Sequence, residues 1–139
     1  MITPQSSLSG EVAIRAEGDI VTARRAVRDA ATHFGFAQSD TARIVTAASE
    51  LARNIYRYAG QGIMRWSKVE RAELSGIQLQ FVDHGPGIVD IKLALGGGYS
   101  TGGGLGLGLP GAKRLSDEMD VESSPGRGTT VTLRKWRRN

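Results

Sequence analysis

The pattern of apolar and polar positions predicts one strand followed by a helix in the first part of the chain. Residues 11–16, EVAIRA, alternate between the two kinds of side chain, as in a strand with one buried face. Apolar residues then recur at helical spacing from Ala23 to Phe34, and Gly35 ends this pattern. Asp19 is the expected cap of the helix, because its carboxylate can accept hydrogen bonds from the free N–H groups of the first turn.

A second helical pattern covers residues 41–60 and ends at Gly60. Ser39 or Asp40 can cap this helix. At about 100° per residue, its apolar positions form one stripe, which consists of Ile44, Ala48, Leu51, Ile55 and Tyr58. We therefore expect the helix to be largely buried along this stripe.

The rest of the chain predicts four further strands and two further helices. The expected strands are 62–70 and 76–83, joined by a turn at Ser75-Gly76, and 119–124 and 129–136, joined by the turn 125–128. The expected helices are 88–95 and 107–118, the second with Pro110 in its first turn.

This order of elements predicts an α/β fold in which helices cover one face of a mixed sheet, a two-layer α/β sandwich. The length of 139 residues suits a single domain, residues 1–139, built around one core. We find no internal repeat in the sequence.

Composition and charge restrict the possible functions and leave an anionic partner open. The formal net charge is +4 and the calculated pI is about 9.9, which suits nucleic acid, a nucleotide or an acidic protein. Cysteine is absent, and the two histidines, His33 and His84, are too few for a typical zinc site. No apolar run approaches the roughly 20 residues that span a bilayer, and the first residues lack the features of a signal peptide. We therefore expect a cytoplasmic protein without a membrane partner.

Three polar residues lie on one flank of the second predicted helix. Glu50, Asn54 and Arg57 fall at i, i+4 and i+7, beside the apolar stripe. One interpretation is an ordinary helix surface with an incidental Glu–Arg pair. In the other, Glu50 takes a proton from a hydroxyl or a water, the amide oxygen of Asn54 binds Mg²⁺, and Arg57 neutralises phosphate oxygens.

A second candidate site lies at the end of a predicted strand, in the sequence FVDHGPGIVD. Asp83 ends the strand, and Gly85 and Gly87 bend the chain after it. The segment can be an ordinary turn. Alternatively, the carboxylate accepts a hydrogen bond from an exocyclic amine such as that of adenine, and the glycines let a flat base approach the backbone because they lack a Cβ.

The third candidate is the segment from Gly96 to Gly108, where eight of thirteen residues are glycine. It precedes a predicted helix, so its backbone N–H groups can surround an anion and the helix N-terminus adds its dipole. We expect a phosphate-binding loop whose first half, 96–101, is a lid that orders over nucleotide. A flexible linker is the alternative, but a linker would not normally carry Leu105, Leu107 and Leu109 at alternate positions.

Other glycine motifs fit this segment poorly. No G-K-[ST] sequence is present, so the segment is not a Walker A loop. Residues 106–111, GLGLPG, match the dinucleotide-binding spacing, but they follow no predicted strand and contain Pro110.

In their order along the chain, these segments resemble the motifs of the GHKL ATPase superfamily, which includes gyrase, Hsp90, histidine kinases and MutL. Glu50-x-x-x-Asn54 resembles its N box, Asp83-x-Gly85-x-Gly87 its first glycine box, and residues 102–108 its second glycine box. Residues 125–133, PGRGTTVTL, resemble its closing element. Each motif is short, and the ordered set carries the resemblance.

Within the superfamily, the chain resembles the stand-alone bacterial serine/threonine kinases of the anti-sigma-factor type, and especially the RsbT-type switch kinases of the stressosome. The similarity lies in residues 49–60, SELARNIYRYAG, and in residues 96–118. It implies that ATP and Mg²⁺ bind, and that phosphate passes to a Ser or Thr of a STAS-domain partner. Phosphorylation would release the kinase to activate a downstream phosphatase or similar effector.

The resemblance also implies roles for individual residues. Glu50 would activate the acceptor hydroxyl, Asn54 would hold Mg²⁺, and Asp83 would read the adenine amine. Thr129 would assist Asp83, and Arg57 matches a basic position that some relatives place one residue later. The other expected nucleotide-binding residues belong to the two glycine boxes: Gly85, Gly87, Gly102, Gly103, Gly104, Leu105, Gly106, Leu107 and Gly108.

Three other functions stay open on the sequence. The main alternative is an anti-sigma factor that sequesters a sigma subunit and uses phosphorylation for release. An ATP hydrolase or conformational clamp fits less well, because the sequence contains no transducer domain. Nucleic-acid binding rests on charge alone, without an aromatic stacking stripe or a recognisable motif, so we expect no nucleic-acid partner.

Overall fold

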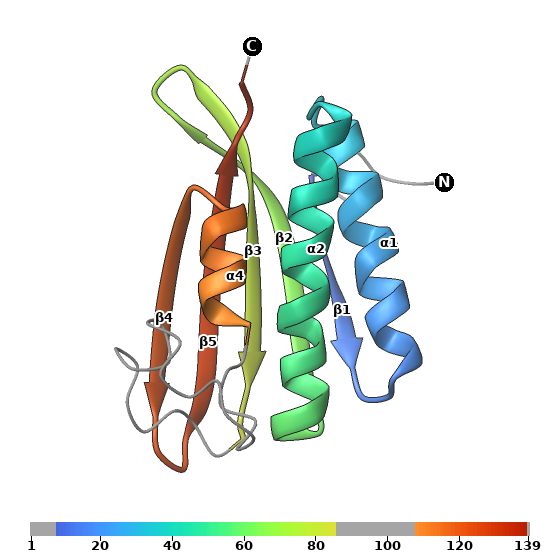
Figure 1. The fold of residues 1–139 in the computed structure, drawn as a ribbon, viewed down its shortest axis with the longest axis vertical. Helices are drawn as coiled ribbons and strands as arrows, with labels where there is room; N and C mark the ends of the chain where they lie inside the picture. The colour runs from blue at the N-terminus through green and yellow to red at the C-terminus, as the bar shows by residue number, and fades with distance from the viewer. Residues whose placement is uncertain (1–7, 86–107, 139) are drawn as a thin grey trace.

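The computed structural model describes residues 8–85 and 108–138, which form a helical layer packed on one face of a sheet (Figure 1). The elements in chain order are β1 (Ser9–Ile14), α1 (Gly18–His33), α2 (Gln38–Asn54), the π-helix η2 (Ile55–Ala59), β2 (Gly62–Arg71), β3 (Leu74–Asp83), α4 (Leu109–Leu115), β4 (Glu118–Ser124) and β5 (Gly128–Trp136). The predicted two-layer α/β sandwich is therefore confirmed.

The sheet has the strand order β1-β2-β3-β5-β4, and every pairing among the described strands is antiparallel. The expectation of a mixed sheet was wrong in this respect. Two helices, α1 and α2, connect β1 to β2, and the second helix reverses the direction of the first (Figure 1). Consequently β2 returns antiparallel to β1, whereas a single crossover helix would have made the two strands parallel.

The core lies between α2 and the central strands. Alternate residues of β3, namely Ile77, Leu79 and Phe81, are buried, as a strand covered on one face requires. The apolar stripe predicted for α2 is confirmed, because all its members except the half-buried Tyr58 are buried. Truncating a buried leucine such as Leu51 to alanine typically costs about 2–5 kcal/mol, so this packing fixes where the polar flank of α2 lies.

The predicted caps of the first two helices were wrong. Glu17 occupies the N-cap of α1, and the carboxylate of Asp19 instead accepts hydrogen bonds from the backbone N–H groups of Arg15 at 2.8 Å and Ala16 at 3.0 Å. It thus holds the turn between β1 and α1. The N-cap of α2 is Ala37, and neither Ser39 nor Asp40 caps it.

The turn between β2 and β3 also differs from the prediction. It consists of residues 72 and 73, with Ala72 at a φ of 53°, whereas Ser75 and Gly76 lie within β3. Gly76 faces Trp136 across the sheet, and a Cβ at that position would lie 2.8 Å from Cε3 of the indole. Gly76, which the sequence analysis interpreted as part of a turn, is therefore needed for close packing between strands.

The helix that was predicted over residues 107–118 is shorter than expected. Helix α4 covers seven residues, with Pro110 in its first turn as predicted. The predicted helix 88–95 and the proposed lid 96–101 lie outside the described residues. No helix in the part of the chain that the structure describes is long and apolar enough to cross a membrane.

Candidate active site

The polar flank of α2 meets the start of α4. Glu50 and Asn54 are half-buried, and Arg57 is exposed. Gly108 precedes α4 with a φ of 64°, and a Cβ at that position would lie 3.0 Å from Oε2 of Glu50 and 3.3 Å from its Cβ. The carboxylate of Glu50 thus lies against the backbone where the glycine-rich segment ends, so two motifs that are far apart in the sequence meet here.

Arg53 is a site residue that the sequence reasoning did not select. Its Nη1 donates to Oε1 of Glu50 at 3.5 Å, across one turn of α2. Among the described residues, no ion pair joins Glu50 to Arg57. The i, i+3 spacing of Glu50 and Arg53 was the available signal, because residues at this spacing are neighbours on a helix surface.

Asp83 ends β3, as predicted, and is held by the backbone on two sides. Its Oδ1 accepts hydrogen bonds from the N–H of Gly85 at 2.9 Å and from the N–H of Thr129 at 3.3 Å. Asp83 and Thr129 are register partners on β3 and β5, which explains how residues far apart in sequence meet. The hydrogen bond from Thr129 to Asp83 comes from its backbone N–H, whereas its hydroxyl lies 2.8 Å from that of Ser123.

The end of β3 and the start of β2 pack closely against the end of the α2–η2 segment. A Cβ at Gly85 would lie 2.6 Å from the Cβ of Ala59, and a Cβ at Gly62 would lie 2.7 Å from Cγ2 of Ile55. Both contacts need glycine, because an added methyl group has no room there. The end of β3 thus lies at the same end of the molecule as the C-terminal end of α2 (Figure 1), and these ends are Asp83 and Asn54.

Several predicted site residues lie outside the described part of the chain: Gly87, Gly102, Gly103, Gly104, Leu105, Gly106 and Leu107. Among the described residues, no three His, Cys, Asp or Glu side chains gather in a group that could hold a metal ion. The carboxylate of Glu50 lies against Gly108, and Asn54 lies one helical turn further along α2. One or two side-chain oxygens suit Mg²⁺, which usually keeps several of its water ligands in proteins.

Comparison with known proteins decides the family. Residues 39–139 match the family described as histidine kinase-, DNA gyrase B-, and HSP90-like ATPase. The chain belongs to this family. The family membership confirms the GHKL resemblance and implies ATP as the nucleotide that the site binds.

Two relatives place the chain within the GHKL family. It is 49% identical over 127 residues to the serine/threonine-protein kinase RsbT of Bacillus subtilis (strain 168), and the match covers 91% of this chain and 96% of that protein. It is 34% identical over 105 residues to the anti-sigma F factor of Thermoanaerobacter sp. (strain X514), covering 70% and 71% of the two chains. The chain is thus an RsbT-like member of the GHKL family that is also related to anti-sigma factors.

A solved structure supports the fold alone. The crystal structure of the RsbU and RsbW domains of Rv1364c from Mycobacterium tuberculosis matches 94% of this chain with a TM-score of 0.61 and 18% sequence identity. The chain spans about a third of that solved chain, 33% of its length. This GHKL chain therefore shares its architecture with a structure that includes an RsbW domain.

Proposed function

We propose that this chain is an ATP- and Mg²⁺-dependent serine/threonine kinase that phosphorylates a STAS-domain protein and acts as a partner-switching regulator of a stress or signalling pathway. The observation that carries the proposal is the position of Glu50, whose carboxylate lies against Gly108 at the end of the glycine-rich segment. A carboxylate in this position can take the proton of an acceptor hydroxyl. The homology to RsbT supports the same activity.

Glu50 acts on the acceptor hydroxyl in this proposal. As the hydroxyl oxygen attacks the γ-phosphorus, its proton passes to the Glu50 carboxylate, the bond to the β–γ bridging oxygen breaks, and ADP leaves. Arg53 donates to Oε1 of the carboxylate, whereas Gly108 lies against Oε2, and the Arg53 contact would restrict the orientation of Glu50. Such a reaction depends mainly on positioning and charge stabilisation, so a small number of side chains is enough.

Asn54 is the proposed Mg²⁺ ligand, with Glu50 one helical turn away on the same flank of α2. When bound, Mg²⁺ would neutralise charge that develops on the transferred phosphoryl group. Arg57, which is exposed near the end of this flank, would neutralise further phosphate oxygens.

Asp83 is the proposed adenine-binding residue. Its Oδ1 is engaged by the N–H groups of Gly85 and Thr129, which orients the carboxylate and directs its other oxygen to the exocyclic amine of the base. Gly85 and Gly87 would let the base approach the backbone, and residues 102–108 would surround the phosphates.

The regulatory part of the proposal follows from the RsbT homology. Phosphorylation of the STAS-domain partner would free this chain to bind a downstream phosphatase or another effector, as in a stressosome. We further propose that residues 1–139 form one kinase domain and that it acts in the cytoplasm, where ATP is available.

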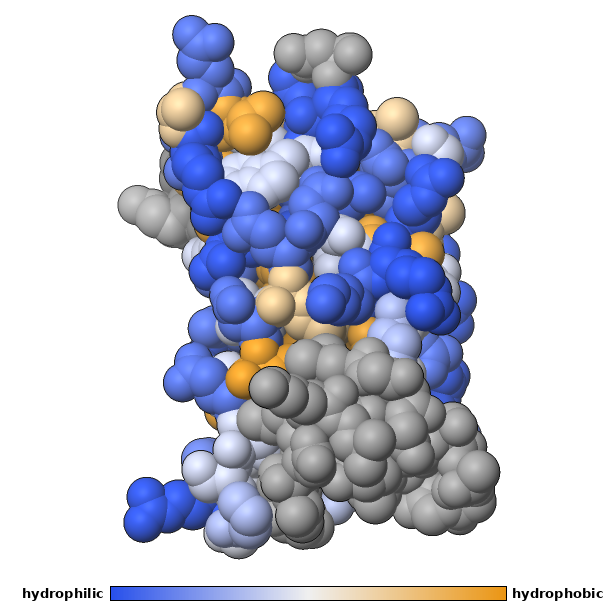
Figure 2. Space-filling model, turned by 60° about the vertical axis from the view of Figure 1, so that its left-hand side comes forward, coloured by the Kyte–Doolittle hydropathy of each residue, from blue (hydrophilic) through white to orange (hydrophobic). Residues whose placement is uncertain are grey.

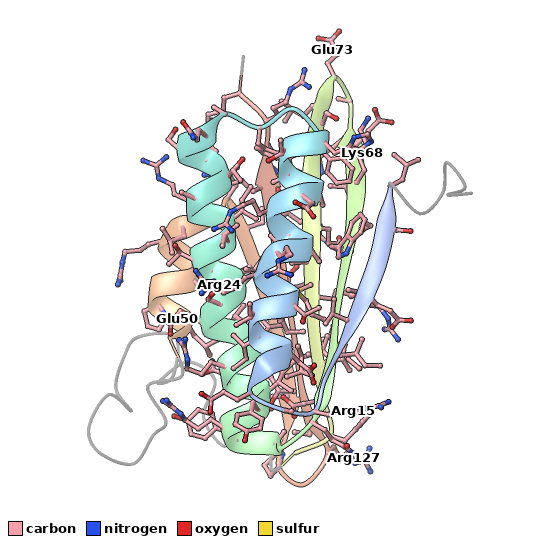
Figure 3. The ribbon with its side chains drawn as sticks, turned by 90° about the vertical axis from the view of Figure 1, so that its right-hand side faces the viewer. Arg15, Arg24, Glu50, Lys68, Glu73 and Arg127 are labelled. Carbon is pink, nitrogen blue, oxygen red and sulfur yellow. The ribbon has the colours of Figure 1, made fainter. Side chains whose placement is uncertain are left out.

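A phosphotransfer assay tests the kinase proposal. The chain would be mixed with Mg²⁺, γ-labelled ATP and each purified STAS-domain protein of the same organism. We expect label on a Ser or Thr of one acceptor, and a loss of about 10²–10⁴-fold in rate for Glu50→Gln with ATP binding retained. Glu73→Gln is the matched control, because Glu73 lies on the β2–β3 turn at the other end of the molecule (Figure 3). Normal transfer by Glu50→Gln would contradict the role of Glu50.

The second candidate function is that of an anti-sigma factor, which the identity to an anti-sigma F factor favours. In that case the chain would bind a sigma subunit with nucleotide present, and phosphorylation would serve only release. Capture of a purified sigma subunit, together with no label on any STAS-domain protein, would support this alternative over the RsbT-type function.

A further inference from the structure

A groove of about 280 Å³ opens between the N-terminal half of α1 and the C-terminal end of the α2–η2 segment. Val21 and Arg24 line it from α1, and Arg53, Tyr56 and Arg57 line it from the other side. Figure 3 looks onto this side of the helical layer and labels Arg24 on α1 and Glu50 on α2. The groove has no part in the nucleotide-binding roles proposed above, apart from Arg57 at its end.

The groove carries apolar surface that the fold does not bury. Four large hydrophobic side chains are exposed in the described part of the chain, and two of them line this groove: Val21, 51% exposed, and Tyr56, 39% exposed. An exposed aromatic side chain beside an aliphatic one is typical of a protein-binding surface, since aromatic residues are enriched at interfaces. The adjacent core positions of α1, Ile20 and Ala23, are buried, so Val21 does not serve the packing of the helix.

The charge of the groove is positive. Three arginines line it and a single acidic residue, Glu17, lies at its edge. Arg24 and Arg57 have no ion-pair partner among the residues that the structure describes. Unpaired guanidinium groups around apolar side chains complement a surface that is acidic and partly apolar. The expected occupant is therefore a protein surface that bears Asp or Glu next to a hydrophobic residue.

Arg53 connects the groove to the catalytic flank. It lines the groove and donates to Glu50 at 3.5 Å, so the groove begins one side chain away from the proposed base. A protein seated in the groove would thus lie beside the position where the acceptor hydroxyl must be presented. Arg53 is therefore the side chain that the groove and the contacts of Glu50 have in common.

We propose that this groove is the docking site for the phospho-acceptor protein, which binds it through an acidic and hydrophobic surface next to the acceptor Ser or Thr. The inference rests on the proposed kinase function and names the surface through which the substrate is selected. Val21 and Tyr56 supply the apolar contact, and Arg24 pairs with an acidic side chain of the acceptor. These residues determine specificity and do not touch the reacting atoms.

Binding and transfer, measured separately, test the proposal. Calorimetric titration of the full chain with the purified STAS-domain acceptor gives the Kd, and labelled ATP gives the rate of transfer. We expect Arg24→Glu and Val21→Ser each to weaken acceptor binding at least tenfold and to leave the Kd for ATP within twofold. Arg65→Glu is the control for the change of charge, because Arg65 is also exposed but lies on β2, outside the groove, where it pairs with Glu11. Exchange of the paired acidic residue of the acceptor for Arg should restore binding to Arg24→Glu.

The outcomes separate this proposal from the kinase proposal. Transfer of label with an unchanged Kd in Arg24→Glu and Val21→Ser would overturn the docking site and leave the kinase function standing. Acceptor binding that depends on the groove, without transfer, would overturn the kinase function and leave the docking site standing. Failure of the wild-type chain to bind any acceptor overturns the docking site. The docking site is also overturned if Arg24→Glu weakens binding to a DNA oligonucleotide and leaves binding to the acceptor unchanged. The groove would then serve nucleic acid.

Discussion

The guanidinium of Arg53 donates to the carboxylate of Glu50 across one turn of α2, with Nη1 3.5 Å from Oε1. Both side chains are about two-fifths exposed, at 41% and 44%. An ion pair of this kind contributes only about 0.3–0.5 kcal/mol to the free energy of unfolding. Its main consequence is therefore the orientation of Glu50.

We expect Arg53→Ala to lower the kcat of phosphate transfer several-fold with little effect on stability, because Glu50 loses the group that restricts its carboxylate. Arg53→Lys should retain more of the rate, since it keeps a donor. Arg43→Ala is the matched control: Arg43 makes the same type of i, i+3 pair with Asp40, at 3.2 Å, near the other end of α2. Kinetic assays and urea unfolding would be run on all variants. An equal loss of kcat in Arg43→Ala would refute a positioning role for Arg53.

Asp83→Asn should separate adenine recognition from folding. Asparagine keeps an oxygen that can accept the N–H groups of Gly85 and Thr129, so the thermal midpoint should change little. Its side-chain amide cannot reproduce both acceptor oxygens of a carboxylate, so ATP binding should weaken by about tenfold or more. Calorimetric titration with ATP and GTP measures the effect. Retention of wild-type affinity and base selectivity would contradict the role of Asp83.

Gly108→Ala tests the contact between the start of α4 and Glu50. Alanine at a φ of 64° costs about 1 kcal/mol in backbone strain, and its Cβ would also lie within 3.0 Å of Oε2 of Glu50. Gly126 provides the control, because it has a φ of 79° and no atom within 4 Å of an added Cβ. We expect both alanine variants to lose similar stability in urea unfolding and only Gly108→Ala to lose phosphate transfer. Equal activity in the two variants would show that the contact is unimportant for transfer.

The lowered pKa of Glu118 predicts that the free energy of unfolding decreases at acidic pH. Hydrogen bonds from Arg71, Trp136 and Arg134 lower the pKa of Glu118 from 4.5 to about 2. Because the folded-state pKa is depressed, the stabilisation is present above about pH 4.5 and is lost as the pH falls toward 2. Glu118 lies on β4, which is an edge strand of the sheet. Figure 2 shows this side of the molecule, where hydrophilic residues cover most of the described surface.

The measurement is urea unfolding between pH 7 and pH 2.5. Glu118→Gln should be less stable than the wild type at pH 7. The difference should shrink as the pH falls below 4.5, because the carboxyl of the unfolded wild-type chain then takes up a proton, which favours unfolding. Glu122→Gln, farther along β4, is the control, since Glu122 has no ion pair among the described residues. A difference that stays constant over the whole pH range would exclude Glu118 as its source.

The apolar patterns of this chain were sufficient to predict whether nearly every described element is a helix or a strand. The stripe from Ile44 to Ile55 predicted the buried face of α2, and alternation predicted β3 and β5, because burial on one side imposes a fixed period on helices and strands. Helix starts were less predictable. Ser39 and Asp40 are favourable caps, yet α2 begins earlier, at Gln38, because a capping preference of about 1 kcal/mol does not by itself fix where a helix begins.

The sequence by itself determined the candidate chemistry: Glu50, Asn54 and Arg57 on one flank, Asp83 at a strand end, and the family to which the ordered motifs belong. Only the tertiary structure decided which of these groups meet. The contact of Glu50 with Gly108 and the hydrogen bond from Thr129 to Asp83 join residues from distant parts of the chain. Local periodicity contains no information on such contacts, because the packing of α4 on α2 and the pairing of β3 with β5 create them.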